Sequence, residues 1–198
     1  MATQAARREE TRRRLLDAAA ELFAERGVDG ASIDAIADRA DRTSGAVYDH
    51  FGGKDGLLFA LLQGWTDAVT ATASAEMATA STLDERIDVL WRAVSVPVAG
   101  EGRWIALEHE LWSYASRHPE ARDHLTARYR AAWKAVSHAV TGWTGDVDRT
   151  GEVGAAVIGL LLGLEMMRLL DPGAVDDDLA RRALLGVIVG TDRAESTP

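Results

Sequence analysis

The amino-acid sequence predicts an all-α protein. Apolar residues recur at helical spacing, only four prolines interrupt the chain, and hydrophobic residues make up 47% of it, enough for a core. No cysteine is present, which excludes a disulfide scaffold and cysteine-based zinc sites. The longest apolar run, Val153–Leu164, is far shorter than the roughly 20 residues of a membrane span. We expect a soluble, cytosolic protein with no signal peptide and no membrane partner.

The first 70 residues predict four helices. The first covers about residues 9–26, where apolar side chains form one stripe, and Gly27 ends it in a left-handed conformation. Ser32 and Thr43 are favourable N-cap residues, so each predicts the start of a short helix. A glycine pair then breaks the chain before a long fourth helix. The two short helices, at about residues 32–51, have the size and spacing of a helix-turn-helix.

The rest of the chain predicts five further helices, about nine in all. Residues 82–85 match a capping box, and Pro119 suits the first position of a helix. Loops are expected at residues 97–100 and 142–148. The helices are expected to begin near residue 82 and to cover about 103–116, 119–140, 149–170 and 177–189.

Two domains are predicted, joined by the fourth helix. Residues 8–68 form a helix-turn-helix head, whose second short helix would dock in the DNA major groove, and residues 69–198 form a C-terminal helical domain. The net charge of −9 is unusual for a DNA-binding protein. Residues 1–55 carry nine basic against eleven acidic residues, so only local clusters of arginine are available for phosphate contacts.

Three segments of the head resemble the TetR/AcrR family of bacterial transcriptional regulators. They are residues 11–27 (TRRRLLDAAAELFAERG), 32–37 (SIDAIA) and 45–51 (GAVYDHF), followed by Lys54 and a leucine pair. The resemblance covers the first quarter to third of the chain. It implies an all-helical homodimer, joined by a four-helix bundle of the last two helices of each subunit. It also implies a C-terminal pocket for a small effector, whose binding changes the spacing of the two DNA-reading heads.

The chain departs from the family's pattern at three positions of the helix-turn-helix. Asp41 replaces a usual glycine, Arg42 a usual aliphatic residue, and Asp49 a usual basic or aromatic residue. Aspartate enters the left-handed conformation more readily than most residues. An acid near phosphates lowers affinity unless it accepts a hydrogen bond from a cytosine amino group or caps an arginine, so the departures affect operator choice.

The candidates for DNA contact open the recognition helix or match the family's phosphate-contacting positions. Small residues at the helix start allow close approach to base edges, although a plain cap with small surface residues has the same pattern. Tyr48 could instead be half-buried, and His50 could cap the helix end. The candidates are Ser32, Arg42, Thr43, Ser44, Gly45, Ala46, Tyr48, His50 and Lys54.

Five residues are candidates for effector binding because they lie on the fourth helix or on helices that would surround the family's pocket. Aromatic residues at helical spacing are more often core than pocket. Glu108, His109 and Glu110 point about 100° apart on a helix, so they cannot hold one metal ion together, and no metal or cofactor is expected. The candidates are Trp65, Trp91, Trp104, Glu108 and Trp112.

The helix over about 149–170 is apolar nearly all round, so it must bury two faces. Dimerisation explains the second face, and Gly159 and Gly163 would allow close approach; the alternative is the central helix of a monomeric bundle. Glu165 is expected to pair with Arg168. The resemblance implies that the last two helices form the dimer interface. The candidates on them are Val157, Leu160, Leu161, Leu164, Leu184, Val187 and Ile188.

The expected function is a repressor that binds a palindromic operator in double-stranded DNA as a homodimer. A small, largely apolar effector would release it. The alternative is a helical ligand-binding or scaffold dimer that has lost DNA binding, which Asp49 and the acidic head favour. An enzyme is the weaker option, because no serine-histidine-acid spacing, phosphate loop or carboxylate pair stands out.

Overall fold

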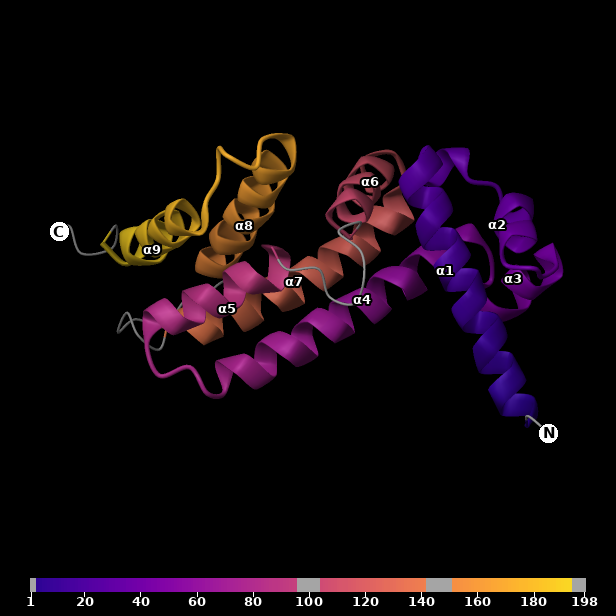
Figure 1. Ribbon diagram of the computed structural model, residues 1–198, viewed down its shortest axis with the longest axis horizontal. Helices are drawn as coiled ribbons and strands as arrows, with labels where there is room; N and C mark the ends of the chain where they lie inside the picture. Colours follow the sequence, from indigo (N-terminus) through magenta and orange to yellow (C-terminus); the bar gives the residue numbers. More distant parts are fainter. Residues whose placement is uncertain (1–2, 96–103, 142–150, 194–198) are drawn as a thin grey trace. The chain divides into compact units, whose positions relative to one another are not determined.

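The computed structural model describes residues 3–95, 104–141 and 151–193, which form nine α-helices and no strand (Figure 1). The all-α prediction is therefore confirmed. The predicted loops at 97–100 and 142–148 lie outside the described residues. In chain order the helices are α1 (Gln4–Gly30), α2 (Ile33–Arg39), α3 (Ser44–Phe51), α4 (Lys54–Met77), α5 (Leu83–Ser95), α6 (Trp104–Arg117), α7 (Pro119–Thr141), α8 (Glu152–Leu170) and α9 (Asp177–Arg193).

Local capping chemistry explains where several helices begin. Ser32 accepts a hydrogen bond from the Ala35 N–H, and Thr43 accepts one from the Ala46 N–H, as predicted. Helix α1 begins earlier than predicted because Thr3 caps it, which adds about a turn and a half to the helix. Gly27 has φ of 73° and kinks α1 where the sequence predicted its end.

The capping box at the start of α5 is confirmed. The Thr82 hydroxyl accepts from the Glu85 N–H at 3.2 Å, and the Glu85 carboxylate accepts from the N–H groups of Ser81 and Thr82. These hydrogen bonds, the one from the Ser81 backbone first, hold the pKa of Glu85 below its usual value. Pro119 occupies the first position of α7, also as predicted.

The chain forms two compact units. The N-terminal unit comprises residues up to 68 together with 106–122, so most of α6 and the start of α7 pack with the helix-turn-helix. The predicted head ended at residue 68 and lacked this second segment. Fully buried side chains from all the helices of the helix-turn-helix head form the core: Leu15, Leu22, Phe23, Ile36, Val47, Leu57 and Leu58.

The C-terminal unit comprises residues 69–105 and 123–198, and helices α5, α8 and α9 pack together in it (Figure 1). Helix α8 also approaches α7 closely at Gly154. A Cβ atom on Gly154 would lie 1.9 Å from the Trp133 carbonyl oxygen, so only glycine fits there. The Gly154 N–H donates to the Ser137 hydroxyl at 2.8 Å, which satisfies a buried donor at the start of α8.

Candidate DNA-binding surface

Helix α3 turns one face into the core and the opposite face to solvent. Val47 is fully buried and anchors the inner face. Gly45, Tyr48 and Asp49 are exposed, and Tyr48 is 58% exposed. Since consecutive residues of a helix lie about 100° apart, Gly45 and Asp49, four residues apart, share one outward face with Tyr48 beside them. This is the face that a recognition helix presents to a major groove.

Both ends of α3 are fixed by hydrogen bonds. At its start the Thr43 hydroxyl caps the helix, and the Ser44 hydroxyl donates to the Asp34 carboxylate of α2. At its end Gly52 adopts φ of 76° and its N–H donates to the Tyr48 carbonyl at 2.9 Å. The Ser44–Asp34 bond ties the two short helices together, so the outward face of α3 has a defined orientation in the N-terminal unit.

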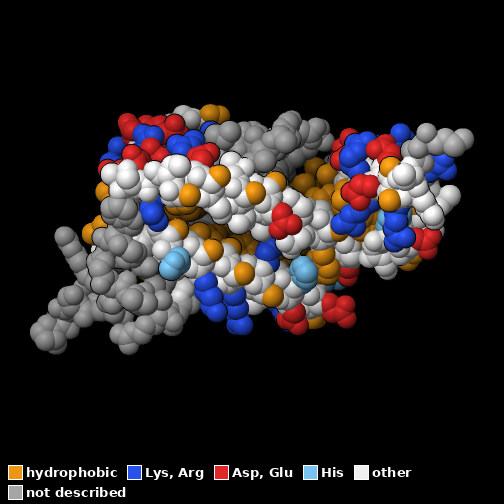
Figure 2. Space-filling model, turned by 90° about the horizontal axis from the view of Figure 1, so that it is seen from below, with side chains coloured by type: hydrophobic (Ala, Val, Ile, Leu, Met, Phe, Trp, Pro, Cys, Tyr) orange, Lys and Arg blue, Asp and Glu red, His pale blue; other side chains and the backbone are white. Residues whose placement is uncertain are grey.

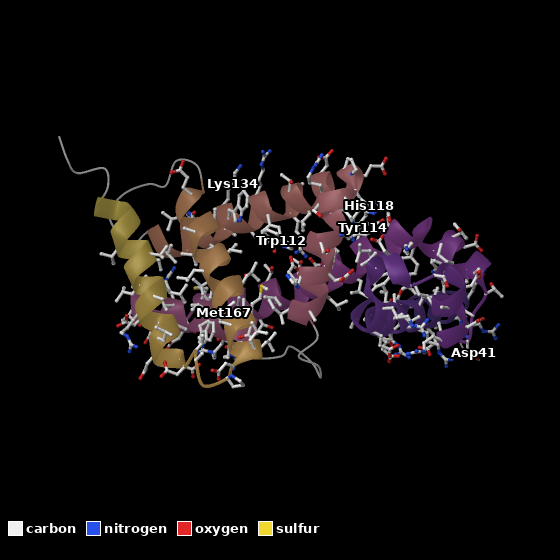
Figure 3. The ribbon with its side chains drawn as sticks, turned by 90° about the horizontal axis from the view of Figure 1, so that it is seen from above. Asp41, Trp112, Tyr114, His118, Lys134 and Met167 are labelled. Carbon is white, nitrogen blue, oxygen red and sulfur yellow. The ribbon has the colours of Figure 1, made fainter. Side chains whose placement is uncertain are left out.

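The turn between α2 and α3 is strained at the position predicted from the sequence. Asp41 has φ of 55°, the left-handed conformation that aspartate tolerates, and it lies in the turn at the outer end of the head (Figure 3). Arg42, next in the chain, donates from Nε to the Thr11 hydroxyl of α1 at 3.1 Å and from Nη1 to the Asp41 carbonyl. Arg42 therefore holds the turn against α1, a structural role that the predicted DNA contact did not include.

Lys54 has a different role from the one predicted. Its ammonium donates to the Val28 carbonyl at 2.9 Å and to the Ala31 carbonyl at 3.3 Å, with the Asp29 carbonyl at 3.5 Å. A cation at the C-terminal end of a helix is favourable because the last carbonyls lack intrahelical partners. Lys54 thus caps the end of α1, a structural role that the sequence did not predict, and its phosphate contact stays a prediction.

The remaining candidates lie on the surface beside α3. Ser32 is exposed and caps α2, and Ala46 is half-buried on α3. His50 is half-buried, with its ring centroid 6.0 Å from that of Phe51. The Arg12 guanidinium lies 4.9 Å from the centroid of the Phe51 ring, so a cation of α1 sits next to the end of the recognition helix.

Most acidic side chains of α1 are neutralised within the head. Arg13 and Arg14 bind Glu10, and Arg39 bridges Glu21 and Glu25. The Arg14 and Arg13 guanidiniums hold the pKa of Glu10 below its usual value. Figure 2 shows both charge signs intermixed over α1–α3, in place of a continuous basic patch. Arg13, Arg14 and Arg39 are therefore occupied by the chain's own acids.

Helix α6 contacts the last turn of α1, and the sequence did not predict this contact. The Glu110 carboxylate accepts from the Val28 N–H at 2.9 Å. The Arg117 guanidinium donates to Asp29 at 2.7 Å and lowers the pKa of that carboxyl. In the sequence, the glycine at position 27 is a local sign of this contact. Its backbone conformation and its missing side chain leave room for the Glu110 side chain.

A second contact joins α6 to the start of α4. The Tyr114 hydroxyl donates to the Asp55 carboxylate at 2.7 Å, and burial followed by the Asp55 hydrogen bond raises the pKa of Tyr114. The Tyr114 ring stacks on His118 with 3.8 Å between ring centroids, and the two side chains lie together in Figure 3. Helix α6 is thus held to the ends of both α1 and α4 inside the N-terminal unit.

Two family models match this chain. Residues 15–61 match "Bacterial regulatory proteins, tetR family", and residues 81–190 match "Tetracyclin repressor-like, C-terminal domain". The second match alone covers more than half of the chain. The chain belongs to the TetR family. TetR-family proteins are DNA-binding transcriptional regulators and not enzymes, so the regulator class and the predicted family are both confirmed.

Individual proteins similar to this TetR-family chain are also transcriptional regulators. The HTH-type transcriptional regulator SrpR of Pseudomonas putida is 53% identical over 58 residues, which are 29% of this chain and 27% of SrpR. The matched part therefore spans about a quarter of that relative's length. A putative TetR-family regulator from Rhodococcus sp. is 26% identical, with a TM-score of 0.72 and coverage of 92% of this chain and 99% of that one.

A further solved structure is that of NalD, described as the secondary repressor of the MexAB-OprM multidrug efflux pump in Pseudomonas aeruginosa. It is 25% identical, has a TM-score of 0.66, and covers 91% of this chain and 96% of its own. The likeness extends over both units, whereas the SrpR match covers 58 residues only.

Trp91, predicted to bind the effector of this TetR-family chain, is a core residue of the C-terminal unit. It is 2% exposed, and its indole N–H donates to Asp177 at 2.7 Å. The guanidinium of Arg168 lies 5.7 Å from the ring centroid, and the same guanidinium pairs with Glu165, as predicted. Both the ring and the donor of Trp91 are used within the fold, so its assignment to a ligand site is corrected.

The other effector candidates fall in different surroundings. Glu108 is buried in the N-terminal unit, and Trp112, on the same helix, is 50% exposed. The side chains of Trp65 and Trp104 lie outside the described residues. The effector site of this TetR-family protein therefore stays a prediction.

The predicted dimer residues face the core of their own unit. Val157, Leu161, Leu184 and Ile188 are at most 4% exposed, and Leu160, Leu164 and Val187 pack against them from half-buried positions. The assignment of the four buried residues to a dimer interface is corrected, whereas Leu160, Leu164 and Val187 stay predicted interface residues. The physical reason is that α8 is apolar all round, so its composition gives no sign of which face lies inside.

The open face of α8 is also apolar. Gly159 is exposed and Gly163 half-buried, and a Cβ atom on either would meet nothing within 4 Å. Met167 and Leu170, 49% and 80% exposed, continue this face, and Met167 is labelled in Figure 3. By length and apolar composition alone, α8 could cross a membrane. Its inner face, however, is packed into the core of the C-terminal unit.

Proposed function

We propose that this TetR-family chain is a repressor that binds a palindromic operator as a homodimer and leaves it when an effector binds. The effector is a small, largely apolar molecule taken up by the C-terminal part of the chain. The observation that carries the proposal is the outward face of α3, held by Val47, Ser44 and the capped helix ends. A repressor role agrees with that of NalD, a secondary repressor. In this role the protein works in the cytoplasm, where it meets DNA.

Dimerisation is proposed through the open faces of α8 and α9. On α9, Gly186 and Gly190 are exposed, and a Cβ on either would meet nothing within 4 Å. They repeat the four-residue spacing of the two glycines on α8, so both helices offer small residues where another helix can approach closely. An exposed apolar face of this kind marks an interaction site in a protein that works in water. To read two half-sites, such a dimer has to hold its two copies of α3 about one DNA turn, roughly 34 Å, apart.

The first experiment is footprinting of the purified protein on the DNA upstream of its own coding sequence, followed by gel-shift titration at several salt concentrations. We expect binding that weakens as salt rises, because phosphate contacts release counterions. Absence of binding even at low salt would favour the scaffold alternative. Compounds that release the bound protein then identify the effector class.

Tyr48→Ala tests the assignment of α3. Because Tyr48 is 58% exposed, its loss should leave the unfolding free energy within about 0.5 kcal/mol of the wild type. Operator affinity should fall by about ten-fold, which corresponds to one lost phosphate or base contact. Lys54→Ala is the contrasting variant, because it removes the cap of α1 and should lower stability. Unchanged operator affinity in Tyr48→Ala would show that α3 does not read DNA through this face.

A further inference from the structure

The outward face of α3 carries one carboxylate, that of Asp49. It is exposed, lies about 200° around the helix from the buried Val47, and is one turn beyond the exposed Gly45. A helical side chain covers the surface over the preceding turn, so the Asp49 carboxylate extends over the bare backbone of Gly45. Within the described ranges the Asp49 carboxylate makes no hydrogen bond or ion pair. Glu10, Glu21 and Glu25 of the same unit are instead held by arginines.

An unpartnered carboxylate on this face limits what DNA can be bound. It accepts hydrogen bonds only, and it is repelled by phosphates and by the acceptor atoms of base edges. In the major groove guanine offers N7 and O6, thymine offers O4, and adenine places its N7 acceptor beside the N6 amino group. Cytosine alone presents an amino donor, N4, without an acceptor of its own beside it. The carboxylate therefore matches cytosine best among the four bases.

We propose that Asp49 is a specificity-determining residue that accepts a hydrogen bond from the N4 amino group of one cytosine in each operator half-site. The inference rests on DNA binding through α3 and adds the base that this helix selects. Gly45 supports it, since the missing side chain lets the base edge come within reach of a short aspartate. The same carboxylate repels the backbone of DNA that offers no cytosine there, so Asp49 also suppresses non-specific binding.

The test is selection of binding sites from a random DNA pool by the full-length wild type, D49A, D49N and the control D38N. Asp38 is an exposed acid at the end of α2, so D38N makes the same charge change off the outward face of α3. Each selected site is then titrated with the proposed cytosine intact or replaced by thymine. Binding to unselected DNA at low salt is measured in parallel.

We expect the wild type to select cytosine at one position of each half-site and to lose about ten-fold in affinity when thymine replaces it. D49A should lose this preference and bind unselected DNA more tightly than the wild type. D49N should move the preference towards adenine, because an amide matches the N6 donor and N7 acceptor. D38N should keep the cytosine preference.

Two other outcomes separate the possible failures. If D49A and D49N select the same sites as the wild type, Asp49 does not read a base and the inference is overturned, while DNA binding stands. If the wild type selects no site at all, operator binding itself fails and the inference fails with it. A wild-type preference for a base other than cytosine that D49A abolishes would also overturn the choice of cytosine.

Discussion

At the scale of single residues, the role in DNA binding that we propose for Gly45 would compete with helix stability. Glycine inside a helix costs about 0.5–1 kcal/mol relative to alanine, and nothing in the head requires it, since an added Cβ would lie 3.7 Å from the Thr43 hydroxyl. Because Gly45 is the second residue of α3 and not an interior one, Gly45→Ala should raise the unfolding free energy by at most about 0.5 kcal/mol. It should also weaken operator binding, because a methyl group would stand between the helix and the base edges.

Chemical denaturation and gel-shift titration of Gly45→Ala measure the two effects separately. The control is Gly64→Ala on α4, where an added Cβ meets nothing within 4 Å. The control should gain stability with no change in operator affinity. If Gly45→Ala is stabilised and still binds the operator as tightly as the wild type, close approach at Gly45 is not needed.

At the scale of helices, the contact of α6 with α1 depends on one glycine and one carboxylate. Gly27 has φ of 73° and ψ of 163°, a region that only glycine enters readily, and an added Cβ would lie 2.7 Å from a Glu110 carboxylate oxygen. Gly27→Ala should thus destabilise the N-terminal unit by about 1–3 kcal/mol from backbone strain, plus the cost of displacing Glu110.

A double-mutant cycle with Glu110→Ala separates these two costs. Glu110→Ala alone removes the partner of the Val28 N–H, whereas in the Gly27→Ala background it also removes the clash. The two losses should therefore be non-additive, with a coupling of about 0.5–3 kcal/mol in urea denaturation. If the two losses of unfolding free energy are additive, the Glu110 side chain moves aside without cost and α6 does not hold the end of α1.

Helix ends could be predicted from the sequence and helix partners could not, for a physical reason. Caps at Ser32, Thr43 and Thr82 act on N–H groups three residues away, so local spacing contains the whole interaction. Lys54 bonds carbonyls 23–26 residues away, and nothing in its neighbourhood distinguishes that role from a phosphate contact. Arg42 is similar, since its partner Thr11 belongs to a different helix.

The same limit explains the errors in the C-terminal part. The spacing of apolar residues in α5 predicted which side of this helix is buried, and Ile87 and Leu90 do lie in the core. Helix α8 is apolar on all sides, so its composition predicted two buried faces and could not say which one stays inside the chain. Only packing against α5 and α9 decides that Val157 and Leu161 face inward. Trp91 shows the same limit, because a tryptophan has the same spacing in a core as in a pocket.

At the scale of the whole molecule, the remaining question is what covers the open apolar face of α8. A second copy of this chain is the occupant we propose, and Gly159 and Gly163 allow a decisive test. A Cβ atom added at either position would meet nothing within 4 Å in the same chain. Leucine is also a better helix former than glycine. The double variant Gly159→Leu/Gly163→Leu should therefore keep or raise the helicity of each subunit while its bulk pushes the two subunits apart.

Sedimentation equilibrium should show a wild-type dimer and a double variant shifted by at least about ten-fold towards the monomer, with unchanged far-UV circular dichroism. Gly64→Leu on α4 makes the same change at an equally open position and should remain dimeric. Because two heads on one duplex bind far more tightly than one, the double variant should also lose operator affinity despite an intact α3.

A double variant that stays dimeric would place the subunit contact elsewhere. A monomeric wild type would mean that α8 keeps its apolar face for a different partner, and a palindromic operator would then have no structural counterpart in the protein.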